Sequence, residues 1–291
     1  MRLVTCLAGA LVLACTAGPS VLAEGPGPSK VLRIVREEIK PARGAAHARA
    51  EEAYVRAGAA SKMPAYWIGM SAVTGPSEAW FFSGYDSYDA LEKENDAFNA
   101  VVGKQMDAAD EGDAQFRTGT RLYLLELNED LSYQMRPTVK DMRYITVMTM
   151  RVKPGYSREF LEVRKALTAA HAKAKVEEHW AFYEVTSGAS AGTYMILFGS
   201  SAMKDDDTDP HTQAYRDAIG DEGRTRSEAF MREGIAGMET VTFEISPQMS
   251  HVPAEWIAAR PGFWKAPSMK MKTTSTAPKE SAVNPASLTK P

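Results

Sequence analysis

Short apolar runs and a clear helical stripe recur between residues 31 and 251, bounded by Gly, Pro and Ser. Residues 31–35 and 144–148 are rich in β-branched and other apolar side chains, which is typical of strands. Over residues 157–174 the apolar positions fall three or four apart, which is the spacing of one helix face; they are Phe160, Val163, Leu167, Ala170 and Ala174. The order of such segments predicts a β-α-β-β-α-β arrangement over residues 31–136 and again over residues 144–251.

The two segments are copies of one unit, because the same landmarks follow in the same order. Corresponding landmarks in the first half of each copy lie 113 residues apart. The paired landmarks are Lys40-Pro41 and Lys153-Pro154, Tyr66-Trp67 and His179-Trp180, and Leu131-Ser132-Tyr133 and Met249-Ser250-His251. We call residues 31–136 copy 1 and residues 144–251 copy 2, and we expect residues 137–143 to link them.

This element order is that of the ferredoxin-like split βαβ unit, which belongs to the α+β class. One such unit leaves one face of its sheet open, and a second copy covers that face most simply. We therefore expect an intramolecular pseudo-dimer with an internal pseudo-two-fold axis, and a monomer in solution, because no partner chain is needed to complete the fold.

The repeats resemble the dimeric α+β barrel superfamily, which includes antibiotic-biosynthesis monooxygenase-like, NIPSNAP-like and EthD-like domains. The chain is also similar to exported bacterial proteins of unknown function. The resemblance covers the topology and the paired landmarks but no catalytic motif, so it implies a fold and assigns no active-site residue. It leaves open a cofactor-independent monooxygenase or a haem enzyme.

The two ends of the chain predict export and a tail. Residues 1–23 have the positive start, short apolar stretch and small final residue of a signal peptide cut before Glu24. The alternative is lipidation of Cys15 within a lipobox-like segment. We expect a periplasmic or extracellular protein with no membrane span, a linker at residues 24–30, an extension anchored by tryptophans at residues 252–266 and a disordered tail at residues 267–291.

Strand alternation suggests a place for a ligand, because successive side chains point to opposite faces of a sheet. Leu125 and Phe243 are apolar, so we expect their face to lie beneath the helices and the opposite face to line the lumen between the two sheets. The charged residues predicted to line this lumen are Arg33, Glu37, Glu126 and Glu244. Such charges in an apolar pocket could orient a small ligand; alternatively they only pair with one another or reach solvent.

Two aromatic pairs are expected at the mouth of the barrel: Tyr66 with Trp67 and His179 with Trp180. The five histidines show no spacing typical of a metal site, so the sequence predicts no metal, and haem ligation rests on the resemblance alone. Both cysteines, Cys6 and Cys15, lie within the predicted signal, which excludes disulfides and thiolate chemistry from the mature chain.

The net charge of −3 gives no indication of a nucleic-acid partner. The function predicted from the sequence is an exported protein that binds a small hydrophobic or amphipathic molecule in the lumen. The alternative from another class is an envelope scaffold that presents its outer helices to a protein partner.

Overall fold

The computed structural model describes residues 28–61, 65–135, 139–207, 209 and 212–265. Each copy contains four strands and two long helices in the predicted order. Copy 1 consists of β1 (Val31–Ile39), α1 (Gly44–Ala60), β2 (Trp67–Ala72), β3 (Glu78–Tyr85), α2 (Tyr88–Ala114), β4 (Arg117–Leu127) and the short 3₁₀ helix η1 (Glu129–Leu131). Copy 2 consists of β5 (Tyr144–Val152), α3 (Ser157–Ala174), β6 (Trp180–Ser187), β7 (Thr193–Ser200), the 3₁₀ helix η2 (Met203–Asp207), α4 (Gln213–Glu233) and β8 (Ile235–His251).

Local signals explain where the helices begin. The hydroxyl of Ser87 accepts the N–H of Ala90 at the start of α2, and that of Thr212 accepts the N–H of Tyr215 at the start of α4. These side chains satisfy backbone donors that have no partner inside a helix. On α3 the predicted apolar stripe turns toward the sheet, with Phe160 among its buried residues.

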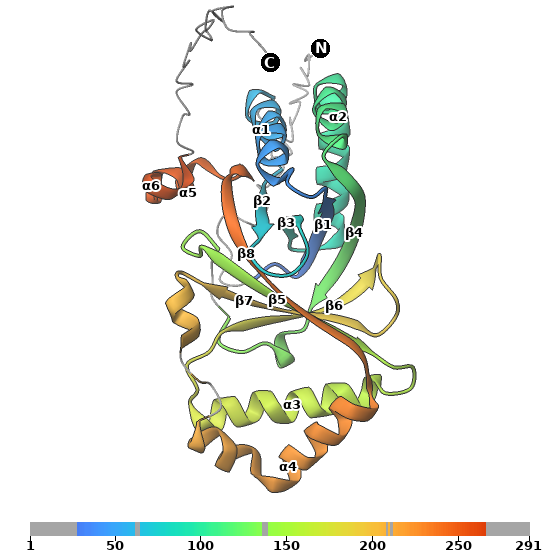
Figure 1. Ribbon diagram of the computed structural model, residues 1–291, viewed down its shortest axis with the longest axis vertical. Helices are drawn as coiled ribbons and strands as arrows, with labels where there is room; N and C mark the ends of the chain where they lie inside the picture. The colour runs from blue at the N-terminus through green and yellow to red at the C-terminus, as the bar shows by residue number, and fades with distance from the viewer. Residues whose placement is uncertain (1–27, 62–64, 136–138, 208, 210–211, 266–291) are drawn as a thin grey trace, which may run out of the picture.

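The eight strands form one closed barrel in the order β1-β3-β2-β8-β5-β7-β6-β4, and all neighbours are antiparallel. Within each copy the order is that of a ferredoxin-like unit, and the two copies join where β2 pairs with β8 and β4 pairs with β6. Figure 1 shows α1 and α2 on one side of the barrel and α3 and α4 on the opposite side. The predicted intramolecular pseudo-dimer is confirmed.

The landmark segment at the end of each copy packs against the other copy. The indole N–H of Trp67 donates to the carbonyl of Met249 at 2.8 Å, and that of Trp180 donates to the carbonyl of Leu131 at 2.8 Å. Each copy therefore closes its last strand against the other copy, as two subunits of a homodimer would. The serine hydroxyls of these segments also accept a backbone N–H from the opposite copy: Phe182 donates to Ser132, and Gly69 donates to Ser250.

The barrel interior is filled by apolar side chains from both copies. Leu125 and Phe243 are fully buried there. Other members of the same buried cluster are Leu32, Ile34, Met70, Trp80, Val147 and Tyr183. The opposite face of each sheet lies beneath the helices: Glu37 faces His47 of α1, and Met150 packs in one cluster with Phe160 of α3.

The predicted assignment of the two faces is therefore wrong. Leu125 and Phe243 face the interior, so their neighbours Glu126 and Glu244 point outward, as does Glu37. The physical reason is that an eight-stranded barrel is just wide enough to be filled by side chains. Unpaired carboxylates in so narrow a space would lose their solvation.

A C-terminal extension, α5 (Ala254–Ala259) and α6 (Pro261–Trp264), follows β8. Trp256 and Trp264 are buried, and the indole of Trp264 donates to the carbonyl of Lys140 in the segment between the copies. Among the described residues no helix is long and apolar enough to cross a membrane. The predicted signal peptide, most of the following linker and the predicted tail lie outside the described residues.

Candidate functional site

The four charged residues predicted to meet in a lumen lie apart on the outer faces of the barrel. Arg33 donates to Asn95 of α2 at 2.8 Å. Glu126 is exposed, and Glu244 pairs with Arg143 at 2.9 Å in a half-exposed position. Glu37 is buried beneath α1. The structure brings none of the four together.

The tryptophans of the two predicted aromatic pairs lie at equivalent places under the helices, Trp67 beneath α1 and Trp180 beneath α3, and not around a lumen. Tyr66 and Trp67 both pack on the ring of His251, with centroid distances of 5.4 and 5.0 Å. Trp180 is buried, and its own neighbour His179 lies outside the core, with Nδ1 2.6 Å from the carbonyl oxygen of Gln134. Of the predicted residues, His179 lines the pocket described next.

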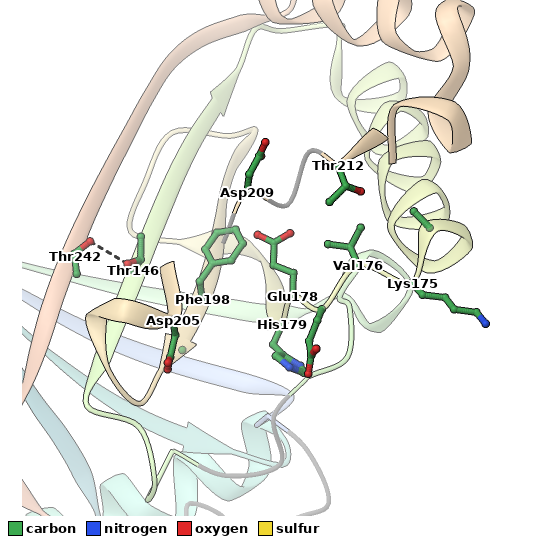
Figure 2. Close-up of a pocket in the computed structure, with 13 residues that line it drawn as sticks. Thr146, Lys175, Val176, Glu178, His179, Phe198, Asp205, Asp209, Thr212 and Thr242 are labelled. Carbon is green, nitrogen blue, oxygen red and sulfur yellow. Dashed lines mark hydrogen bonds between the residues drawn. The ribbon is translucent and has the colours of Figure 1, made fainter. Parts of the chain in front are cut away.

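A pocket of about 500 Å³ lies on the outer face of copy 2, beside the end of α3 (Figure 2). Thr146 and Thr242 are joined there by a hydrogen bond of 2.9 Å across β5 and β8. The ring of Phe198 and the side chain of Val176 give the pocket an apolar part, and Glu178 and His179 add polar groups. The pocket lies outside the barrel, whose interior is filled by side chains.

The copies differ at the strand positions that form the floor of this pocket. Thr146 pairs with Phe198 and Thr242, and in copy 1 the residue with the same pairing is Arg33, opposite Ser83 and Leu124. The long side chain of Arg33 extends to Asn95 of α2 and occupies this place. A threonine in copy 2 leaves the corresponding volume empty.

Acidic side chains dominate the charge around the pocket. Glu177, Glu178, Asp205 and Asp209 line it, and Lys175 is the lysine among its lining residues. In Figure 2 the Lys175 side chain points away from the other lining side chains. Acids therefore outnumber bases among the lining side chains, an arrangement that favours a ligand with positive charge or hydrogen-bond donors.

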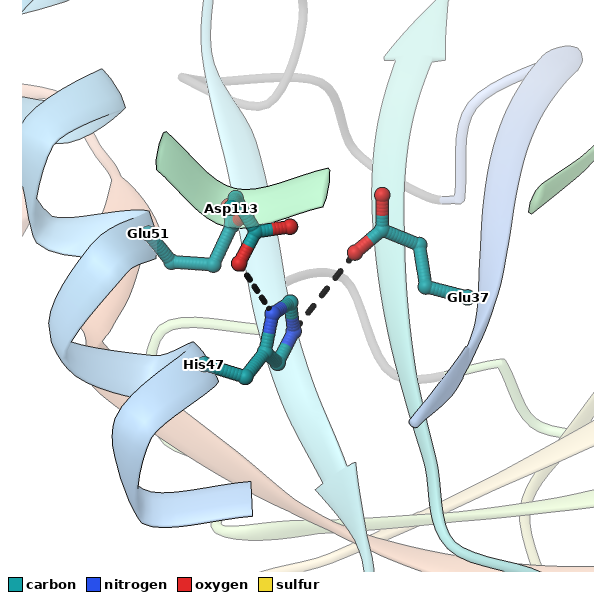
Figure 3. A group of neighbouring side chains, drawn as sticks. All are labelled: Glu37, His47, Glu51 and Asp113. Atoms are coloured by element: carbon teal, nitrogen blue, oxygen red, sulfur yellow. Dashed lines mark hydrogen bonds and ion pairs between the residues drawn. The ribbon is translucent and has the colours of Figure 1, made fainter. Parts of the chain in front are cut away.

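A second polar group lies buried in copy 1, between the sheet and α1 and α2 (Figure 3). His47 Nδ1 is 2.6 Å from Asp113 Oδ1, and its Nε2 is 3.5 Å from Glu37 Oε2. Arg117 of β4 contacts Glu37 Oε1 at 2.6 Å and Asp113 Oδ2 at 2.9 Å. Glu51 of α1 completes the group, and one ligand atom from each acid and from His47 lies within 4.8 Å of all the others. We call these five residues the buried polar cluster.

Burial changes the acidity of this cluster. It raises the pKa of Glu37, an effect that Arg117 and His47 oppose. Burial, followed by the nearby carboxylates of Glu37 and Asp113, raises the pKa of Glu51 to about 9. Glu51 is therefore a neutral carboxylic acid at neutral pH in the metal-free protein.

Sequence reasoning missed the pocket and most of the cluster. Glu37 was predicted as a site residue with the wrong neighbours, and His47 was one of five histidines without a suggestive spacing. Comparison of the copies at the offset of 113 residues carries the signal, because it places His47 opposite Phe160 and Glu37 opposite Met150.

No protein-family profile matches the sequence, and no curated protein matches it. Among solved structures, a proposed monooxygenase from Fusobacterium nucleatum aligns at 13% identity and a TM-score of 0.49, covering 75% of this chain and 93% of that one. An anthrone oxidase-like protein aligns at 16% identity and a TM-score of 0.49, covering 75% and 92%. A haem-binding protein from Thermus thermophilus aligns at 12% identity and a TM-score of 0.39, covering 82% and 100%.

These similarities leave the activity of the chain open. Its own strand order and pairing define the fold: two ferredoxin-like units in one polypeptide close an eight-stranded barrel through β2–β8 and β4–β6. The chain therefore has the fold of a dimeric α+β barrel, with both halves of the barrel in one polypeptide.

Proposed function

We propose that this chain is an exported protein that binds a small amphipathic molecule in the pocket of copy 2. The observation that carries the proposal is the open volume of about 500 Å³ with an apolar part at Phe198 and Val176 and acids around it. Pockets of about 300–1,000 Å³ with a mainly apolar lining and a few polar groups are the usual form of small-ligand sites.

The polar groups favour a ligand with an apolar body and a cationic or donor-rich head. Glu178 lies 3.2 Å from His171 Nε2, which fixes its carboxylate at the pocket. His179 adds a ring nitrogen, since its Nδ1 is engaged by the carbonyl of Gln134 and its Nε2 forms no hydrogen bond to a residue that the structure describes. The amine head group of a ligand would therefore find hydrogen-bond acceptors in the pocket, and a carboxylate head group would be repelled by its acidic side chains.

Haem fits this pocket poorly. His179 provides an imidazole of the type that binds haem iron. The two haem propionates are anionic, however, and they would face Glu177, Glu178 and the two aspartates that line the pocket. We therefore assign no haem-dependent step to the chain.

Calorimetric titration of the purified protein with decylamine and with decanoate tests the proposal, because the two probes share one apolar chain and differ in the charge of the head. We expect decylamine to bind and decanoate not to bind. Thr146→Arg should abolish binding, because it restores the long side chain that fills this place in copy 1. Thr240→Arg, at an exposed position on β8, is the matched control and should bind decylamine normally.

Equal binding of the two probes, or normal binding by Thr146→Arg, would contradict the proposal. Mass spectrometry of molecules that co-purify with the protein from its native envelope then identifies the physiological ligand. Export has its own test: the native N-terminus should be Glu24 or a lipidated Cys15, and an intact Met1 would refute it.

A further inference from the structure

Three residues of the buried polar cluster of copy 1 have apolar counterparts in copy 2. By strand pairing, Glu37 corresponds to Met150 and Arg117 corresponds to Ile235. By position after the Lys-Pro landmark, His47 corresponds to Phe160. Across the helix pair, His47 contacts Asp113 of α2, whereas Phe160 contacts Phe230 of α4 with ring centroids 5.6 Å apart.

The fold itself therefore does not require charges at these three positions, whereas the residue that corresponds to Glu51 at the same offset, Arg164, is also charged. Copy 2 forms the same strands and helices around a cluster containing Met150, Phe160 and Phe230, all at most 4% exposed. Burying charged groups in place of such side chains is unfavourable unless a partner compensates them. We therefore expect another group to compensate the buried charges of the cluster in copy 1.

Three buried polar atoms of the cluster form no hydrogen bond among the described residues: Asp113 Oδ2, which has the ion pair with Arg117, and His47 Nε2 and Glu37 Oε2, which are close to each other. His47 Nε2 and Glu37 Oε2 lie 3.5 Å apart, and neither forms a hydrogen bond to any residue that the structure describes. The side chains are 2% and 6% exposed, so bulk water does not solvate them. Asp113 can only accept a hydrogen bond as a carboxylate, so the 2.6 Å contact places the proton of His47 on Nδ1. The Nε2 lone pair then points at a carboxylate oxygen, and a cation or a proton must lie between them.

The distance between His47 Nε2 and Glu37 Oε2 suits a metal ion that binds both atoms. Metal–nitrogen and metal–oxygen bonds of about 2.0–2.2 Å at a tetrahedral angle put two ligand atoms about 3.4 Å apart, and the observed distance is 3.5 Å. Asp113 lies on the far side of the imidazole and fixes its orientation. A carboxylate in this position is a usual partner of a metal-binding histidine. Figure 3 shows Glu37 and Asp113 on opposite sides of the ring and Glu51 on the same helix as His47.

The charges also balance. Among the buried groups, the carboxylates of Glu37, Glu51 and Asp113, when ionised, and the guanidinium of Arg117 leave a net charge of −2, which one divalent cation neutralises. Asp110 also contacts Arg117, but its side chain is 63% exposed and water solvates it. A mixed set of imidazole and carboxylate ligands suits Zn²⁺, Mn²⁺ or Fe²⁺ better than it suits Ca²⁺ or Cu⁺.

We propose that copy 1 holds a divalent transition-metal ion with His47 Nε2, Glu37 Oε2 and the Glu51 carboxylate as its ligands, and that Asp113 and Arg117 orient them. This site is separate from the pocket of copy 2 and does not depend on the proposed small-molecule function. Because all its ligands are buried, the ion enters when α1 and α2 open or while the chain folds.

The test uses the full-length protein, made metal-free with a chelator and refolded from denaturant with Zn²⁺ or Mn²⁺. After desalting, elemental analysis should find about one ion per chain, and the loaded protein should have a higher Tm than the metal-free protein. If neither ion is retained and neither raises the Tm, the cluster is a proton-bridged structural network and the proposal is wrong.

Variants locate the ion. The double variant Glu37→Met with His47→Phe installs the copy 2 side chains, and it should lose both the ion and the metal-dependent rise in Tm. Glu51→Gln keeps the shape of the side chain and should weaken retention at least tenfold, which keeps the test valid if the double variant fails to fold.

The matched control is His171→Gln in copy 2. His171 is also a buried histidine beside a glutamate, but it lies outside the cluster. This variant should retain one ion per chain. Loss of the ion in His171→Gln, or full retention in Glu51→Gln, would overturn the assignment.

Discussion

Replacing Glu51 with glutamine should flatten the pH dependence of stability in the metal-free protein. The pKa of Glu51 is about 9 in the folded chain against an ordinary value of 4.5. Between these values the folded protein keeps a proton that the unfolded chain has lost, so the free energy of unfolding falls as pH rises. At about 1.4 kcal/mol per pH unit, this group alone lowers it by up to about 4 kcal/mol from about pH 5 to about pH 8. Glutamine cannot ionise, so that contribution disappears.

Urea unfolding in the presence of a chelator, repeated from about pH 5 to about pH 8, measures the effect. Burial also raises the pKa of Glu37, so Glu51→Gln should retain a smaller slope of the same sign. The adjacent Glu52 provides the control, because its side chain is 40% exposed and Glu52→Gln should follow the unmodified protein. If the unmodified protein and Glu51→Gln lose stability in parallel, the reasoning about the buried proton is wrong.

Three further predictions concern the rest of the molecule. Arg164→Met should leave the free energy of unfolding in urea unchanged or raise it by about 1 kcal/mol. Burial lowers the pKa of this guanidinium to about 10, and its Nε has no hydrogen-bond partner among the described residues. A clear loss of stability would contradict this prediction. Trp67→Phe and Trp180→Phe should lower the free energy of unfolding by similar amounts, about 1 kcal/mol each. Trp67→Phe removes a hydrogen bond to the carbonyl of Met249, and Trp180→Phe removes one to the carbonyl of Leu131. Strongly unequal losses of stability would show that the two junctions are not equivalent. Light scattering should give a monomer, since each copy completes the barrel of the other, and a dimer that survives dilution would refute this.

The fold was predictable because its signals are local and occur twice. Turn residues such as Lys40-Pro41 and Lys153-Pro154 interrupt strand-like runs at matching positions, and the stripe on α3 specifies one buried helix face. Each copy has one open sheet face, so a chain with two copies has a simple way to bury both. These features depend on neighbours along the chain, which a sequence displays directly.

The assignment of sheet faces was not predictable in this way. Both faces of these strands are covered, so apolar residues occur on each: Leu32 and Ile34 face the interior, and Ile39 faces the helices. Alternation defines two sets of side chains but does not say which set the barrel encloses. Barrel closure decides, because the interior has little room for water, and the charged side chains that it does contain, Arg36 and Glu78, are paired with each other.

The sequence by itself determined the duplicated unit and its topology, and the structure added that the end of each copy packs on the other copy. Only the tertiary structure decided where chemistry can occur, since Asp113 and His47 meet across 66 positions of the chain, between the ends of α2 and α1. The sequence specifies the type of each residue, whereas the exposure of that residue to solvent and its charged neighbours depend on which elements cover it. For that reason Glu37 was noticed from the sequence as a charge on a strand, and the fold made it part of a buried cluster with His47.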